Sequence, residues 1–148
     1  MPTLERLPSR NRLPGGLPAG AGTAATSAGL VSPGTVASSI ASVTITTANT
    51  GDLLVNGKDM GAAISCSAAG PCSAIWGLYV DGVAIPKSGQ QLEAATAGND
   101  MESVVVYGIA SGVPAGTHTV ELKVSPSASD EGLIFGADQQ VEAIALKG

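Results

Sequence analysis

The chain has 148 residues, of which 13% are charged, and a formal net charge of −5, which leaves room for one domain with an extension. Residues 1–12 hold three Arg and one Glu, for a charge of +2, whereas residues 13–148 hold four Lys and eleven acids, for −7. Nucleic-acid surfaces need clustered Lys and Arg, so the acidic body argues against nucleic acid as a partner.

Two further compositional features bear on location and assembly. No window approaches the roughly 20 apolar residues of a membrane helix, so we expect no membrane association. Prolines and glycines among residues 8–18 interrupt any apolar core of a secretory signal, which favours synthesis in a cytoplasm. Aromatic residues make up only 3% of the chain, and a core of Val, Ile, Leu and Ala buries modest area, which favours a homo-oligomer.

Residues 1–38 are predicted to be an extended N-terminal arm, followed by a domain over residues 39–148. No charged residue lies between Arg12 and Asp52, and Leu-Pro occurs three times, at 7–8, 13–14 and 17–18. Each proline biases its predecessor toward extended geometry, and low charge reduces the cost of burying the arm on a partner. Arg6, Arg10 and Arg12 either anchor the tip of the arm to acidic partner residues through bidentate pairs or keep it soluble.

The domain begins with alternating sequence. From Ile40 onward, Val43 and Ile45 alternate with Thr44 and Thr46, which predicts a strand with one apolar face and one hydroxyl face. Thr50–Gly61 follows, and its asparagines and glycines favour a turn-rich connection.

Two cysteines, Cys66 and Cys72, flank the turn sequence Ser-Ala-Ala-Gly-Pro. If the segments on either side are neighbouring strands, the two sulfurs can face each other across the loop within the reach of a disulfide. The alternative is two free thiols, as is usual in a reducing compartment. Two Cys and one His cannot supply the four ligands of a Cys/His zinc site.

The clearest local structure is a hairpin around Asp81-Gly82, a favoured two-residue turn. In that register Val80 opposes Val83 and Leu78 opposes Ile85. The five apolar side chains of the hairpin then share one face: Trp76, Leu78, Val80, Val83 and Ile85.

Further strands are predicted over Gln91–Thr96, Ser103–Ile109, Thr117–Val124, Gly132–Phe135 and Gln140–Leu146, with a tight return at Ser111–Gly116. In Thr117–Val124 the residues His118, Val120, Leu122 and Val124 share a face. No segment shows sustained helical periodicity. The pattern predicts an all-β chain: an antiparallel β-sandwich, jelly-roll-like or immunoglobulin-like, with an extended N-terminal arm.

The search for chemistry predicts no catalytic, cofactor-binding or metal site. His118 is the one histidine and lies in an alternating strand, which favours a packed residue over a catalytic base. No Gly-x-Ser-x-Gly elbow occurs, and the glycine-rich residues 15–22 lack the Lys of a phosphate loop. The acidic residues are scattered, and Trp76 and Tyr79 lie on opposite faces of one strand, so they form no single sugar platform.

Three segments resemble the β-sandwich modules of tailed bacteriophage virions, found in decoration, fibre and minor tail proteins. They are Leu78–Val83, Gly112–Leu122, which contains Ala-Gly-Thr-His-Thr-Val, and the closing strand Gln140–Leu146. The resemblance spans roughly Ala74–Leu146 and implies a virion structural role, often as a trimer or other oligomer. It carries over no active site.

The sequence therefore predicts a non-enzymatic structural protein that decorates or cements a phage particle, assembled in the host cytoplasm. Its partners would be the major capsid or tail protein and copies of itself, with a trimer favoured. The alternative is an adhesin or fibre module that binds a host surface or a glycan through loops at one end of the sandwich.

Overall fold

A computed structural model describes the backbone of residues 24–26, 30–31, 37–65, 72–94, 99–126, 132–134 and 138–146. Side chains are described for 37–60, 73–91, 103–125 and 139–146. Within these ranges the regular structure is strand, and the strands pair antiparallel, which confirms the predicted all-β class. Residues 1–23 lie outside the described residues, and the N-terminal arm therefore stays a prediction.

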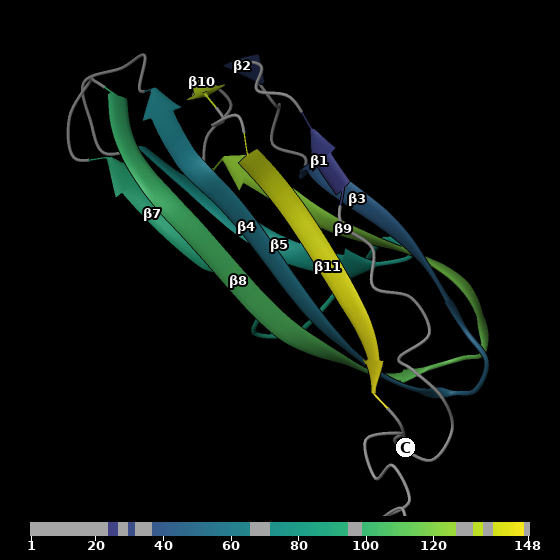
Figure 1. Cartoon of the computed structure of the whole chain (residues 1–148). Helices are drawn as coiled ribbons and strands as arrows, with labels where there is room; N and C mark the ends of the chain where they lie inside the picture. The colour runs from purple at the N-terminus through teal and green to yellow at the C-terminus, as the bar shows by residue number, and fades with distance from the viewer. Residues whose placement is uncertain are drawn as a thin grey trace, which may run out of the picture.

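The first sheet has six strands and is built around β4 (Gly51–Ser65). One edge of β4 pairs with β8 (Asn99–Val113), and its other edge pairs with β11 (Asp138–Leu146), which in turn pairs with β1 (Ala24–Thr26). The C-terminal end of β4, residues 63–65, pairs with β10 (Gly132–Ile134), and β10 pairs in turn with β2 (Leu30–Val31). Figure 1 shows β8, β4 and β11 side by side across this sheet.

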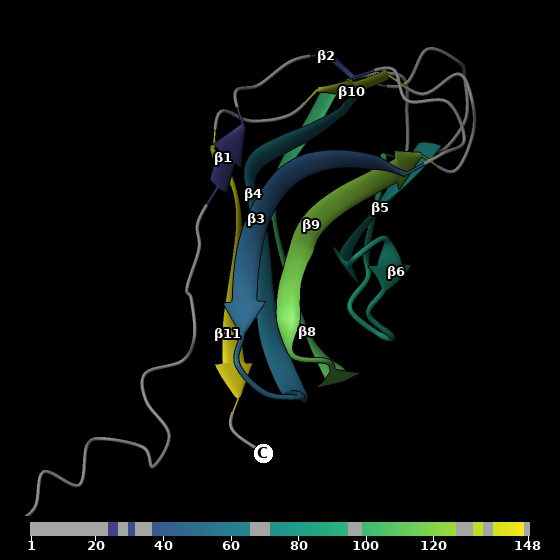
Figure 2. The same ribbon diagram turned by 90° about the vertical axis from the view of Figure 1, so that its right-hand side faces the viewer.

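The second sheet has five strands and lies behind the first. Its order is β3 (Ser38–Thr47), β9 (Gly116–Pro126), β5 (Cys72–Val80) and β6 (Val83–Ala84), and β7 (Gln90–Ala94) also pairs with β5. The turned view in Figure 2 shows β3 and β9 of the second sheet side by side. The chain is thus an antiparallel β-sandwich, as predicted.

Among the described side chains, the core between the sheets is aliphatic apart from the large aromatic ring of Trp76. On β3, Ile45 is buried while Thr44 and Thr46 are exposed, which confirms the predicted alternation. On β9, the residues from His118 to Val124 alternate as predicted, with the even-numbered side chains buried. Period-two patterns therefore identified the two neighbouring strands β3 and β9 correctly.

The prediction of a turn-rich connection over Thr50–Gly61 is wrong, because β4 runs through it. Leu53, Val55, Gly57 and Asp59 all point into the core. A Cβ on Gly57 would lie 2.9 Å from Leu78 Cδ2 and 3.1 Å from Leu122 Cδ1, so this glycine makes room for side chains of the opposite sheet. The glycine typical of a turn serves here as a core residue of a central strand.

The hairpin is confirmed in its turn and register. Asp81 and Gly82 have φ of 49° and 80°, the left-handed values that a type I′ turn requires, and Val80 pairs with Val83. The Ile85 N–H donates to Leu78 O at 2.8 Å, and Ile85 is buried. Val83 departs from the expected apolar cluster, because β6 is a two-residue edge strand that leaves this side chain 71% exposed.

The remaining predicted strands are confirmed with changed ends. β8 extends through Val113, so the predicted return at Ser111–Gly116 narrows to the residues around Pro114. Within the predicted arm, β1 and β2 pair with β11 and β10 of the same chain. Part of residues 1–38 therefore adds strands to the chain's own first sheet.

Replacing Gly57 by Val is expected to lower the free energy of unfolding by about 1–3 kcal/mol, because the added methyl groups overpack the side chains of Leu78 and Leu122. Gly77→Val is the matched control: a Cβ there lies 3.5 Å from Tyr79 Cε2, an ordinary contact. Urea unfolding of both variants measures the difference, and equal stability of the two would contradict the packing argument.

Candidate functional site

The outer face of the second sheet is mainly polar, with Ile75 of β5 as an exposed apolar exception. Thr44 and Thr46 of β3 and Thr117 and Thr119 of β9 are exposed there, and Thr46 Oγ1 and Thr117 Oγ1 are hydrogen-bonded at 3.1 Å. Toward β5, Lys123 Nζ lies 3.1 Å from Glu121 Oε2 and 4.9 Å from the centre of the Tyr79 ring. Exposed hydroxyl groups and an ion pair are compatible with contact between this face and water.

The outer face of the first sheet differs, because apolar side chains gather on it. On β8, Val105 is 53% exposed, Tyr107 is 74% exposed and Ile109 is 50% exposed. Apolar side chains of β4 and β11 continue the surface, and together these residues form what we call the apolar face: Leu54, Met60, Val105, Tyr107, Ile109, Ile144 and Leu146. Exposed apolar side chains gathered on one face mark a docking surface more often than scattered apolar residues do.

Strand register places these side chains in rows that cross the sheet. The rows, in the order β8, β4, β11, are Ile109, Leu54 and Ile144; then Tyr107, Asn56 and Glu142; then Val105, Lys58 and Gln140. One row is fully apolar, and the next two combine one apolar side chain with polar neighbours. The apolar character is therefore strongest along β8, the edge strand.

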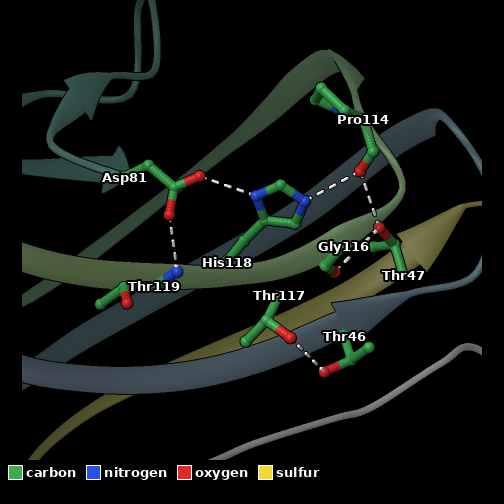
Figure 3. A network of polar contacts seen from close by, with 8 residues as sticks. All are labelled: Thr46, Thr47, Asp81, Pro114, Gly116, Thr117, His118 and Thr119. Carbon is green, nitrogen blue, oxygen red and sulfur yellow. Dashed lines mark hydrogen bonds and ion pairs between the residues drawn. The ribbon is translucent and has the colours of Figure 1, made fainter.

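A second feature is the polar cluster at one end of the sandwich, shown in Figure 3. His118 Nδ1 lies 2.7 Å from Asp81 Oδ2, and His118 Nε2 lies 2.8 Å from the carbonyl oxygen of Pro114. The Thr119 N–H donates to Asp81 Oδ1 at 2.8 Å, and Thr47 Oγ1 donates to the Pro114 oxygen at 2.8 Å. The cluster joins the β5–β6 turn to the return between β8 and β9.

The surroundings of the imidazole determine its charge. An ionised carboxylate and a carbonyl only accept hydrogen bonds, so both ring nitrogens of His118 donate in the fully bonded cluster, and the ring is then cationic. The hydrogen bond with Asp81, followed by that with Pro114, raises the pKa of His118. The hydrogen bond with His118, followed by the Thr119 amide, lowers the pKa of Asp81. No ring nitrogen is left to act as a general base in this arrangement.

A hollow of about 350 Å³ opens beside this pair. Its walls are mainly apolar, from the hairpin residues Val80–Pro86 on one side and Ala110–Pro114 on the other. The described residues that line it include no Phe, Tyr or Trp ring on which a sugar could stack. The hollow therefore favours an apolar occupant over a glycan.

A carboxyl group is buried inside the sandwich. Asp59 of β4 is fully buried, and its Oδ2 accepts a hydrogen bond from Trp76 Nε1 at 2.9 Å. Its other oxygen, Oδ1, accepts no hydrogen bond from the described part of the chain. Burial raises the pKa of the Asp59 carboxyl, and hydrogen bonds with the side chains of Trp76 and Gln139 oppose that rise. The sequence carries no local signal for this pair, because Asp59 and Trp76 are 17 residues apart and lie on strands of different sheets.

The structure leaves the predicted site residues largely untested. Arg6, Arg10, Arg12 and Cys66 lie outside the described residues, and Cys72 is described only by its backbone at the start of β5. The disulfide and the arginine anchors stay predictions. Among the residues with described side chains, no group of three or more His, Cys, Asp and Glu is placed to hold a metal ion. No helix long and apolar enough to cross a membrane occurs in the described ranges.

Comparisons with known proteins include a distant likeness among solved structures. No protein-family model matches the chain, and no curated protein matches it. Among solved structures, the chain is similar to the CBM36-1 domain of a multidomain xylanase from the hindgut metagenome of Trinervitermes trinervoides, with 10% identity and a TM-score of 0.37. The match covers 87% of this chain and 100% of the other. A likeness at this level carries no functional argument.

The His118–Asp81 pair is expected to make stability depend on pH in a defined window. Because the folded state raises the pKa of His118, its contribution is complete below the unfolded value near 6.5 and is lost as pH rises through the folded value. The folded state also lowers the pKa of Asp81. The stabilising contribution of Asp81 is therefore complete above the unfolded pKa of about 3.9 and is lost as pH falls through the folded value. The pair therefore stabilises most in mildly acidic solution.

Asp81→Asn tests this, because Asn tolerates the left-handed backbone of the turn while it removes the charge. Melting temperatures across the neutral range should fall less steeply with rising pH in the variant than in the native chain. Asp52→Asn, which alters an exposed hydrogen bond to the Gly112 amide, is the control and should keep the native profile. Identical profiles for native chain and Asp81→Asn would contradict the assignment.

Replacing the buried Asp59 by its isostere Asn and by the apolar residue Leu should change the stability of the fold in opposite directions. Its raised pKa means that stability is lost as pH rises above the unfolded value, so Asp59→Asn should gain stability relative to the native chain between acidic and neutral pH. Asp59→Leu leaves the Trp76 N–H without its acceptor and should lower the free energy of unfolding by about 1–3 kcal/mol. Urea unfolding at two pH values measures both effects. An Asn variant that loses stability toward neutral pH would contradict them.

Proposed function

We propose that this chain is a non-catalytic structural protein of a phage particle, which it decorates or cements at the capsid or the tail. The observation that carries the proposal is the apolar face on the first sheet. A surface on which Tyr107 is 74% exposed gains free energy when another protein covers it. The resemblance of the turn-and-strand segments to phage virion modules indicates the kind of particle.

The contrast between the two sheets supports attachment by one side. The second sheet turns threonine hydroxyls and the Lys123–Glu121 pair outward, which suits contact with water. The first sheet turns Val105, Tyr107 and Ile109 outward. A decoration protein needs such an arrangement, with one face for the particle and the other for solvent.

The N-terminal residues fit the same proposal. The basic tip with Arg6, Arg10 and Arg12 precedes an uncharged segment that ends at Asp52. In the proposal the tip pairs with acidic residues of the major capsid or tail protein, and the uncharged residues lie along its surface. The pairing of β1 with β11 places Ala24, which follows residues 1–23 in the sequence, at the edge of the first sheet.

A glycan-binding module is the second candidate, and one row of side chains favours it. Asn56 lies between Tyr107 and Glu142 across three strands of the first sheet. A tyrosine ring offers a stacking surface, and amide and carboxyl groups hydrogen-bond hydroxyls. In this alternative the sugar lies on the sheet face rather than at the loops, where the hollow has no aromatic wall.

The proposal predicts that particles released from a culture that encodes the chain contain it at a fixed ratio to the major capsid or tail protein. Mass spectrometry of gradient-purified particles measures this ratio. Exchanging Tyr107 and Ile144 for Ser, or removing residues 2–23, should lower the ratio severalfold, because each change removes part of the attachment. Ile75→Ser, an exposed apolar position on the second sheet, is the matched control and should leave the ratio unchanged.

Particles that lack the native chain would contradict the proposal. A glycan array probed with the purified chain distinguishes the glycan-binding alternative from the structural role. If the native chain binds a glycan and Tyr107→Ala abolishes that binding without changing the fold, the adhesin reading replaces the structural one.

A further inference from the structure

We propose that two copies of this chain pair through their β8 strands, in antiparallel orientation about a twofold axis at Tyr107, to form one continuous sheet. This goes beyond attachment to a particle and does not depend on it. β8 is the starting point, because it pairs with β4 along one edge and with no other described strand along the opposite edge. Fifteen residues of strand, Asn99–Val113, therefore present a free edge within the described structure.

Free edges are normally protected against such pairing by charged side chains, prolines or bulges. From Ser103 to Val113 the sequence has no charged residue and no proline. Between Val104 and Ala110 the register with β4 runs without a bulge. Charges, prolines and bulges are therefore absent from the middle of β8.

The absence of charge also points to a second copy as the occupant. Each chain carries a net charge of −5, so two copies can pair closely only through a surface that sets no like charges directly opposite each other. Ser103–Val113 is such a surface. The chain's own residues 1–23 are a poorer occupant, because their four prolines lack the N–H groups that a strand ladder needs.

A twofold axis at Tyr107 makes the edge complementary to itself. It sets Tyr107 against Tyr107 of the second copy and Val105 against its Ile109, all on the outer face of the sheet. On the inner face it sets Val104 against Ala110 and Val106 against Gly108 of the second copy. From Ser103 to Ser111 every directly opposed pair is thus uncharged, and the exposed aromatic and branched side chains of the two copies lie side by side.

Charge pairs introduced at positions 105 and 109 test the register. Val105→Glu combined with Ile109→Glu sets like charges opposite each other twice and should raise the dimer dissociation constant at least about tenfold. Val105→Glu combined with Ile109→Lys sets opposite charges in the same places and should restore pairing close to the native level. Sedimentation equilibrium over a concentration series measures each constant, and circular dichroism confirms that the variants are folded.

Two controls separate the edge from other causes. Ile75→Glu with Val83→Glu adds the same net charge on exposed positions of the second sheet and should leave the dimer intact. A chain that lacks residues 2–23 should also remain a dimer, whereas dissociation on truncation would identify the N-terminal residues as the clasp and overturn the proposal. A monomeric native chain, or equal behaviour of the two variants at positions 105 and 109, would overturn it as well.

Discussion

The hydrogen bond from the Trp76 indole to the Asp59 carboxyl joins the two sheets inside the sandwich, and the packing of the central strands is arranged around it. Trp76 is the one tryptophan of the chain and is fully buried, so its N–H must have a partner there. Asp59 supplies that partner from β4, and two residues earlier Gly57 leaves space for Leu78 and Leu122. A large ring and two leucines of one sheet thus fit against a glycine and a short acid of the other.

This arrangement explains which parts of the fold the sequence could predict. Alternation identified β3 and β9, and Asp81-Gly82 fixed the hairpin turn, because those signals are local and depend on one strand and its immediate neighbour. β4 was mistaken for a connection, because its inward positions include Gly57 and Asp59, which are typical of turns. Their role depends on Trp76, Leu78 and Leu122, which reach them only after the sheets have packed.

The candidate sites divide in the same way. That His118 is packed followed from its place in an alternating strand, but its partner Asp81 did not, because their contact requires β5 and β9 to be neighbours. The apolar face was hidden for the same reason. Val104, Val105 and Val106 form a continuous apolar run, and only the pairing of β8 with β4 shows that Val105 turns outward while its two neighbours are buried.

The apolar face and the free edge of β8 reinforce each other. A twofold axis perpendicular to the sheet keeps the outer faces of both copies on the same side, so the proposed pairing would join two apolar faces into one wider surface. β1 lies at the opposite edge of the sheet from β8, so the N-terminal residues of the two copies would extend from the far ends of that surface. Such a dimer would bind a particle at its centre through apolar contact and at both ends through the arms. Because the contacts are linked, binding at one of them would raise the effective concentration for the others and so increase the overall affinity.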